Sequence, residues 1–268
     1  MNPLAISEKE FKLFRDLIYD SAGISMAESK KQLIASRLSS RLRYYQFSKF
    51  IEYYNFITSE DQNQEKQIFI DLLTTNETSF FREPVHFEFL KNEILKNFDR
   101  KRIFRVWCAA CSSGEEPYTM SMVLSDTLGE NKWEIIASDI SSRILEKSRQ
   151  GMYPIEKAKQ IPPNYLKKYC LRGKGSKEGY FKISTMIRSK INFLYVNLIE
   201  PLPNLGKFDL ILLRNVMIYF DQTTRKSLVE KLVPLIHEKG YLFIGHAETL
   251  LNITDSLKSI RPAIYRKV

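Results

Sequence analysis

From Ile103 onward the chain alternates between short apolar segments with strand character and longer segments with helical periodicity. The apolar run at residues 208–213 is nearly continuous, which is typical of a parallel strand that is buried on both faces. We expect strands at residues 105–109, 134–138, 208–213 and 240–245, and helices at residues 115–128, 141–149 and 222–238. This alternation predicts an α/β fold with a doubly wound, Rossmann-like sheet.

The first 75 residues lack any strand pattern and show helical periodicity instead. Ser7 and Glu10 have the spacing of a capping box, and Gly23 fits the end of the helix that they start. Further helices are expected at residues 33–42, 48–57 and 62–73. A stretch of poor helix formers at residues 74–78 then interrupts the pattern. We therefore predict a small all-helical domain at residues 1–75 and a second domain at residues 76–268.

One segment breaks the alternation of the second domain. Residues 165–195 contain Gly173, Gly175 and Gly179, with β-prone stretches at residues 180–183 and 191–196. We predict a small antiparallel β insertion with a glycine-rich turn at this place.

The net charge of +10 is concentrated in two basic regions. Residues 140–195 hold thirteen basic and three acidic residues, an excess equal to that of the whole chain. The second region holds six basic residues and no acidic one within it: Lys30, Lys31, Arg37, Arg41, Arg43 and Lys49. Such regions attract an anionic partner, which is either a nucleic acid or an acidic protein surface.

Other classes of protein are disfavoured. The most apolar stretch, at residues 210–220, is too short for a bilayer helix and contains Arg214 and Asn215. The first residues lack the apolar core of a signal peptide, so we expect a cytoplasmic protein without membrane insertion. The three cysteines are too few for a disulfide framework, and Cys108 and Cys111 lack a second ligand pair. With three histidines widely spaced in the sequence, no metal centre is expected.

The loop after the first strand of the second domain has the character of a cofactor site. Small residues at positions 109–114, ending in Gly114, allow a ligand to approach the backbone. Asp139 ends the next strand, where an acidic side chain commonly binds ribose hydroxyls. Glu115 and Glu116 at the start of the following helix disfavour a pyrophosphate there. These residues indicate a nucleoside cofactor that lacks phosphates and carries positive charge, as S-adenosylmethionine does.

Several motifs together resemble the CheR family of chemotaxis receptor methyltransferases. The motifs occur in the family's order and read TTNETSFFRE at residues 74–83, WCAACSSGEEPY at 107–118, ASDI at 137–140, VNL at 196–198, FDLILLRNVMIYFD at 208–221 and GHAE at 245–248. The family more often has serine at position 247. The resemblance implies an enzyme that transfers the methyl group of S-adenosylmethionine to receptor glutamates, giving methyl esters and S-adenosylhomocysteine.

The resemblance also implies roles for individual residues. Arg82 and Tyr219 are the expected catalytic residues, Arg82 orienting the incoming carboxylate and Tyr219 lying near the transferred methyl group. The expected cofactor-binding residues are Asn76, Thr78, Arg82, Gly114, Glu116, Asp139, Asn197, Leu198, Arg214 and Asn215.

A glutamate carboxylate is ionised at neutral pH, because its reference pKa is about 4.3. The reaction therefore needs alignment and exclusion of water rather than a general base. The expected partner is the cytoplasmic domain of methyl-accepting chemotaxis receptors. In some members of the family the β insertion also binds a receptor's C-terminal peptide, and the segment at residues 172–179 resembles that of those members. We expect a monomer that does not bind nucleic acid.

Two alternatives remain open at this stage. The basic charge allows a methyltransferase that acts on RNA or a small molecule, although the chain lacks the Asn/Asp-Pro-Pro-aromatic motif of amino methylation. A receptor-binding module with the same fold and no catalysis is the other alternative. Against it stands the joint presence of six expected site residues: Asn76, Arg82, Glu116, Asp139, Asn215 and Tyr219.

Overall fold

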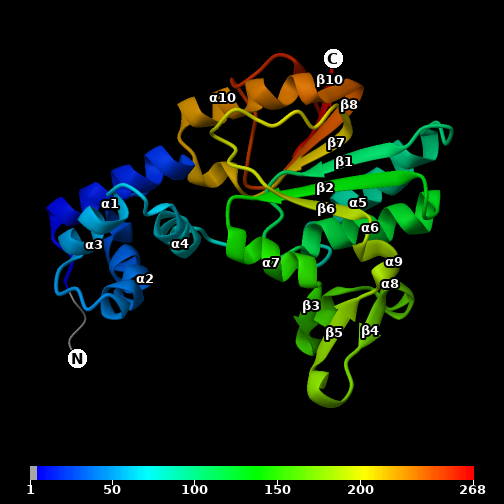
Figure 1. Ribbon diagram of the computed structural model, residues 1–268. Helices are drawn as coiled ribbons and strands as arrows, with labels where there is room; N and C mark the ends of the chain where they lie inside the picture. The colour runs from blue at the N-terminus through cyan, green and yellow to red at the C-terminus, as the bar shows by residue number, and fades with distance from the viewer. Residues whose placement is uncertain (1–4) are drawn as a thin grey trace.

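The computed structural model describes residues 5–268, so the first four residues of the expected helical domain lie outside it. Its centre is a seven-stranded sheet with strand order β6-β2-β1-β7-β8-β10-β9 (Figure 1). The strands are β1 (Phe104–Cys108), β2 (Trp133–Asp139), β6 (Ile191–Tyr195), β7 (Phe208–Leu213), β8 (Ile236–Ile244), β9 (Leu257–Arg261) and β10 (Ile264–Lys267). The first five strands in that order run parallel, whereas β10 pairs antiparallel with both β8 and β9.

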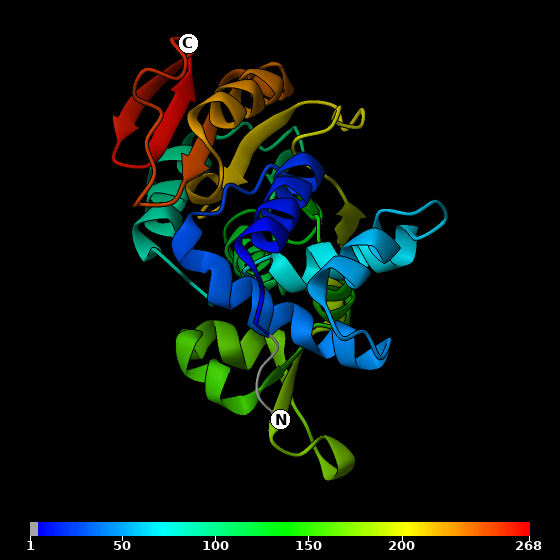
Figure 2. The same ribbon diagram turned by 90° about the vertical axis from the view of Figure 1, so that its left-hand side faces the viewer.

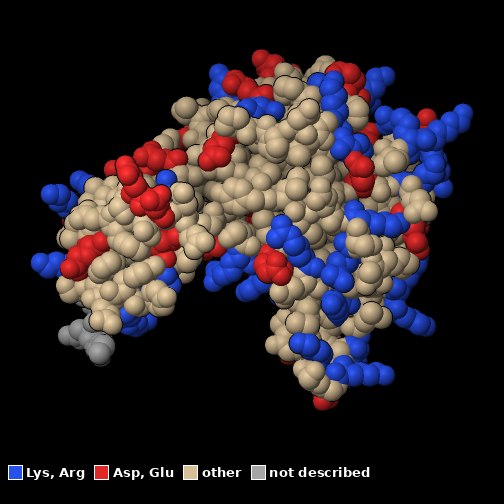
Figure 3. Space-filling view, viewed as in Figure 1, with Lys and Arg blue, Asp and Glu red and all other residues tan. Residues whose placement is uncertain are grey.

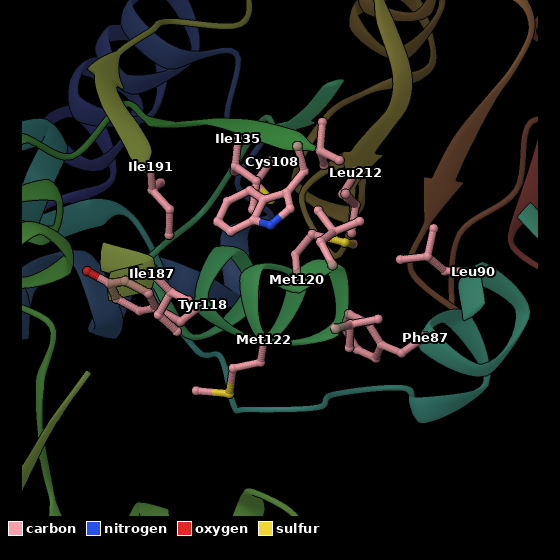
Figure 4. Close-up of a cluster of buried hydrophobic side chains, with 14 of the residues drawn as sticks. Phe87, Leu90, Cys108, Tyr118, Met120, Met122, Ile135, Ile187, Ile191 and Leu212 are labelled. Carbon is pink, nitrogen blue, oxygen red and sulfur yellow. The ribbon is translucent and has the colours of Figure 1, made fainter. Parts of the chain in front are cut away.

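Helices cover both faces of this sheet, as the alternating sequence predicts. One core contains side chains of α5 (Pro84–Phe89), α6 (Glu115–Leu128) and α7 (Ser142–Gln150), and the other contains side chains of α10 (Gln222–Leu232). Figure 4 shows the first core, where Cys108 and Leu212 lie near Met120 of α6. Alternate residues of each strand enter opposite cores, which explains why β7 is buried along its whole length.

The N-terminal helices form a separate layer with their own core, which includes Phe14 and Ile18. These helices are α1 (Glu8–Ala22), α2 (Lys31–Tyr44), α3 (Phe50–Ile57) and α4 (Asn63–Leu73). The capping box of Ser7 and Glu10 is present, and Gly23 ends α1 with a φ of +70°. A Cβ atom on Gly23 would come within 2.5 Å of Ile199, so this glycine also permits close contact with the second domain.

The β insertion differs from its expected extent at both ends. Its sheet has the order β3-β5-β4 and begins earlier, with β3 (Met152–Pro154), followed by β4 (Cys170–Arg172) and β5 (Tyr180–Ile183). The short helices α8 (Pro163–Tyr169) and α9 (Thr185–Arg188) flank these strands. Residues 191–195, which we expected in the insertion, form β6 and pair in parallel with β2 of the main sheet. A short β-prone segment does not reveal which sheet it joins, because that choice depends on distant partners.

Two further expectations fail near the C-terminus. The helix expected at residues 222–238 ends at Leu232, because Pro234 lacks the N–H group that would continue it. A 3₁₀ turn follows, and β8 begins at Ile236, before the expected start of that strand. The hairpin of β9 and β10 was not predicted at all. Within residues 5–268, no helix combines the length and apolar character required to span a bilayer.

Candidate active site

A cavity of about 380 Å³ lies at the carboxyl ends of β1, β2 and β7, where ligands bind in open α/β sheets. Ten of the eleven residues predicted for the site line it: Asn76, Thr78, Arg82, Glu116, Asp139, Asn197, Leu198, Arg214, Asn215 and Tyr219. The helical domain supplies a further wall through residues between Ala22 and Leu33. Sequence analysis missed this wall, because apolar and small residues after a helix carry no chemical signal.

Gly114 is the predicted residue that does not line the cavity. It precedes α6 with a φ of +95°, a conformation that side chains other than hydrogen rarely allow. A Cβ atom there would lie 3.0 Å from the Tyr153 hydroxyl and 3.1 Å from the Ser148 hydroxyl. Gly114 is therefore required for the turn and its packing, and the prediction of direct cofactor contact finds no support in its position.

Asp139 ends β2 at the cavity floor, where its side chain is held by the backbone. Its carboxylate accepts hydrogen bonds from the N–H groups of Ser112 (2.8 Å) and Ser141 (2.9 Å). Burial raises the pKa of Asp139 to about 6, against the opposing effect of these two N–H donors. The carboxylate keeps lone pairs for two further donors, as a ribose diol requires.

One side of the cavity is formed by an ion cluster, in which Arg214 and Glu116 line the cavity and Glu83 binds Arg214 without lining it. We use the name "inner wall" for these three residues. Arg214 follows β7, and its guanidinium donates to Glu116 Oε2 (2.7 Å) and Glu83 Oε2 (3.0 Å). Its side chain is 3% exposed. Burial alone would lower the pKa of Arg214, but the two carboxylates outweigh burial and raise it. The guanidinium is thus a fixed, fully charged part of the wall.

Glu83 and Glu248 support the site through hydrogen bonds, and sequence analysis did not single them out. Glu83 has a φ of +58° and accepts hydrogen bonds from the His246 N–H group (3.1 Å) as well as from Arg214. Glu248 accepts from the N–H groups of Asn215 (2.9 Å) and Gly245 (2.6 Å). Both glutamates occur inside the quoted motifs, which was the available signal, and both hold the loop that carries Asn215.

The outer part of the cavity, which we call the mouth, contains Arg82 and Tyr219. Arg82 donates to the Glu77 carbonyl oxygen (3.0 Å) and has no carboxylate partner within residues 5–268. Tyr219 belongs to the 3₁₀ turn Met217–Tyr219 and packs against the cores of both domains. Its carbonyl oxygen accepts from the Ser25 N–H group (2.8 Å), which fixes the helical domain beside the mouth.

Three other predicted residues also line the cavity: Asn76, Asn197 and Leu198. The Asn197 amide donates to the Ser21 carbonyl oxygen (2.9 Å) and to Glu200 (3.0 Å), so it joins α1 to the second domain. Leu198 beside it is buried. The Asn76 carbonyl oxygen accepts a hydrogen bond from the Ser112 hydroxyl (2.9 Å). This bond joins the interdomain linker, residues 74–78, to the cofactor loop, residues 109–114.

The two cysteines of the cofactor loop behave as packing residues. Cys108 and Cys111 are both buried and are not in a disulfide. Burial raises the pKa of each thiol well above its usual range, so both stay protonated and unreactive at neutral pH.

The polar groups at the cavity fit S-adenosylmethionine better than a dinucleotide. Asp139 offers acceptors to ribose hydroxyls, and the buried Glu116 at the start of α6 faces the position where a pyrophosphate would otherwise bind. A cofactor with a sulfonium and an ammonium group suits such an acidic helix start.

Comparison with known proteins agrees with this chemistry. The sequence matches the family described as "CheR methyltransferase, all-alpha domain" over residues 9–74 and "CheR methyltransferase, SAM binding domain" over residues 76–265. It is 41% identical to the chemotaxis protein methyltransferase of Escherichia coli, over 93% of this chain and 87% of that protein. It is also 40% identical to that of Borreliella burgdorferi, over 98% and 95%. The chain therefore belongs to the CheR methyltransferase family, and S-adenosylmethionine is its cofactor.

Proposed function

We propose that this protein transfers the methyl group of S-adenosylmethionine to glutamate side chains of chemotaxis receptors. The observation that carries this proposal is the state of Arg82. Arg214 at the inner wall is neutralised by two carboxylates, whereas Arg82 at the mouth has no acidic partner within the described residues. A guanidinium with a free donor edge at the mouth is suited to a carboxylate substrate, which it binds through two parallel hydrogen bonds.

The residues at the site can support this reaction without a general base. The cofactor supplies an electrophilic methyl group on a positively charged sulfur. A glutamate substrate with a pKa of about 4.3 arrives ionised, so no proton has to be removed from it. Arg82 orients the carboxylate, the Tyr219 hydroxyl contributes a second donor, and the walls of the cavity exclude water.

The same geometry distinguishes substrate from cofactor contacts. Asp139 and Glu116 are the acidic groups that line the deep part of the cavity, and both are buried and hydrogen bonded. An anionic substrate is repelled from that part and attracted to Arg82. In this proposal Asn76, Thr78, Asn197, Leu198, Arg214 and Asn215 complete the cofactor pocket.

The basic surfaces support an acidic protein partner, but the two regions are not equivalent. In the helical domain, Arg41 pairs with the buried Glu65 (2.6 Å), and Arg37 donates to the carbonyl oxygens of Leu73 (2.8 Å) and Thr74 (3.1 Å). These two arginines stabilise the fold and the linker. In the β insertion, by contrast, Arg172, Lys174, Lys177 and Lys182 are exposed and have no carboxylate partner in the described chain.

Figure 3 shows Lys and Arg side chains gathered over the insertion, and a hollow between the insertion and the helical domain. Figure 2 shows the two lobes from the side, with the helical domain above the insertion. The glutamate-rich helices of a receptor fit this arrangement in sign of charge.

We extend the proposal to a receptor's C-terminal peptide, which would bind the insertion. Because β5 lies between β3 and β4, each outer strand has one unpaired edge in its three-stranded sheet. Leu171 on β4 is 60% exposed, which is unusual for a leucine in a strand. An exposed edge with an apolar side chain is suited to the addition of a peptide strand.

The test is a methylation assay with labelled S-adenosylmethionine, receptor-bearing membranes, and the wild-type protein beside Arg82→Ala. We expect base-labile label on the receptors, as carboxyl methyl esters give, and its loss in the variant. If the cofactor binds and no receptor is labelled, the receptor assignment is wrong, and the same assay with RNA identifies that alternative. Absence of cofactor binding by either protein would contradict the proposal at its root.

A separate experiment addresses the peptide. Arg172→Glu combined with Lys174→Glu reverses charge on the insertion at two residues that do not line the cavity. We expect weaker binding of an acidic receptor-tail peptide and unchanged cofactor binding. Equal peptide binding by both proteins contradicts the role of the insertion without affecting the methylation proposal.

A further inference from the structure

Beside the inner wall, and sharing Glu83 with it, three potential metal ligands from distant parts of the sequence lie close together. Glu83, His86 and His246 each offer one ligand atom, and these atoms all lie within 4.8 Å of one another. Glu83 Oε2 is 3.5 Å from His86 Nδ1 and 4.0 Å from His246 Nε2. The two imidazole rings lie at 77° to each other with their centroids 5.0 Å apart. We call these three residues the rear cluster.

The imidazole of His86 is a second, independent indication of a ligand at the rear cluster. Its side chain is 1% exposed, yet neither ring nitrogen has a hydrogen-bond partner within the described chain. Leaving a buried polar group without a partner costs about 1–3 kcal/mol, so such a group in a folded protein requires an explanation. A cation held by one of these ring nitrogens would give the buried imidazole the partner that it lacks.

We propose that Glu83, His86 and His246 form a binding site for a divalent transition-metal cation of the Zn²⁺ type. Two imidazoles and one carboxylate are ligands that Zn²⁺ accepts, with water completing the tetrahedron. Ligand distances of about 2.0–2.2 Å require the three atoms to move together by roughly an ångström or less. His246 is 47% exposed on its side chain, so it can turn and gives the cation a route from solvent.

The cluster is coupled to the cofactor cavity through one oxygen atom. Glu83 Oε2, the proposed ligand, is the atom that accepts hydrogen bonds from Arg214 Nη2 (3.0 Å) and Nε (3.4 Å). A cation on this oxygen repels the guanidinium and competes for the same lone pairs. Arg214 then loses one of its two carboxylates, and its position at the cavity changes. Zn²⁺ and S-adenosylmethionine therefore bind antagonistically, and each weakens the other by the same factor.

The first experiment measures metal binding by itself. Zn²⁺ affinity is determined by competition with a chromogenic chelator, and Co²⁺ absorption reports the coordination geometry. We expect one equivalent of Zn²⁺ to bind the full chain and the affinity to fall at least about tenfold in His246→Gln, since one of three ligands is lost. His237→Gln is the matched control, because this third histidine lies at the opposite end of β8 and should leave the affinity unchanged. Absence of binding, or binding that His246→Gln does not weaken, overturns the proposal.

The second experiment measures the coupling and needs no receptor or methyl transfer. Calorimetry gives the affinity for S-adenosylmethionine with and without saturating Zn²⁺. We expect a lower cofactor affinity in the presence of Zn²⁺ for the wild type and for His237→Gln, and no such change for His246→Gln. If the cofactor affinity is the same with and without the metal, the antagonism is refuted. Both results are independent of whether the receptor is the methyl acceptor.

Discussion

The inner wall and the mouth of the cavity each carry one arginine, yet the two arginines are in opposite states. Arg214 is buried and held by Glu83 and Glu116, whereas Arg82 donates only to a backbone carbonyl oxygen. The backbone differs as well, because Phe81 and Glu83, on either side of Arg82, both have positive φ values. Such strain persists only where the surroundings enforce it. The comparison indicates that one arginine maintains the shape of the site and the other is presented to a ligand.

The largest effect that follows from this comparison is on folding stability. Arg214→Met leaves the buried Glu116 and the partly buried Glu83 without their cation and should lower the free energy of unfolding by about 3–5 kcal/mol. Arg82→Met removes a partly exposed side chain and should change it by no more than about 0.5 kcal/mol. Urea unfolding of both variants checks the pair of values. Equal destabilisation by the two changes would remove the distinction between inner wall and mouth.

The next effect is on catalysis and concerns the mouth. Arg82→Lys keeps the charge but loses the planar fork that aligns a carboxylate. We expect kcat to fall about 100-fold, as misplacement of a reacting group commonly causes, while the affinity for the cofactor changes much less. Single-turnover methylation and cofactor titration separate the two quantities. A loss confined to cofactor affinity would instead place Arg82 wholly in the cofactor pocket.

A third effect is a pH dependence at the cavity floor. The pKa of Asp139 is raised from 3.8 to about 6, so the stability this group contributes is present below pH 3.8 and is lost as the pH rises through about 6. Cofactor binding has the opposite sign, because ribose hydroxyls need the ionised carboxylate as acceptor. We expect the cofactor affinity to fall by up to about tenfold per pH unit below pH 6. Calorimetry from pH 5 to pH 8 should show this slope in the wild type and a flat profile in Asp139→Asn.

The smallest effect belongs to Tyr219. Its hydroxyl makes no hydrogen bond within residues 5–268, so Tyr219→Phe breaks no contact of the described chain and, under the proposed function, removes one donor to the substrate. One neutral hydrogen bond contributes about 1 kcal/mol, which predicts a roughly fivefold lower kcat and an unchanged free energy of unfolding. Steady-state methylation beside thermal unfolding tests both parts. A drop as large as that of Arg82→Lys would mean that Tyr219 does more than donate one hydrogen bond.

The parts of the fold that sequence analysis predicted are those in which local pattern and final environment agree. The helix Glu115–Leu128 and the strand Phe208–Leu213 have the expected bounds. The assignment of residues 191–195 failed, because sheet membership depends on pairing with β2. The helix after Asp221 is predicted to end at residue 238 but ends at Leu232, because Pro234 cannot continue it.

At the cavity, residues with distinctive chemistry could be predicted from the sequence, whereas residues that support them could not. Asp139 and Arg214 are both at the cavity, where their motifs placed them. Glu83 acts through Arg214, and a supporting contact of this kind between residues 131 positions apart leaves no local pattern. Gly114 is predicted to contact the cofactor but does not line the cavity, and a side chain on it would meet Tyr153 and Ser148. Sequence spacing does not distinguish a glycine required for packing from one required for ligand approach.

The helical domain reaches the second domain at Gly23 and through the bonds of Ser21 and Ser25, and its residues between Ala22 and Leu33 form one wall of the cavity. The pocket is complete only when the two domains, each with its own core, are docked. Ligand binding and domain docking are therefore thermodynamically coupled. A ligand that contacts both domains stabilises their association, and the association strengthens ligand binding by the same free energy. We therefore expect bound S-adenosylmethionine to stabilise the association of the two domains.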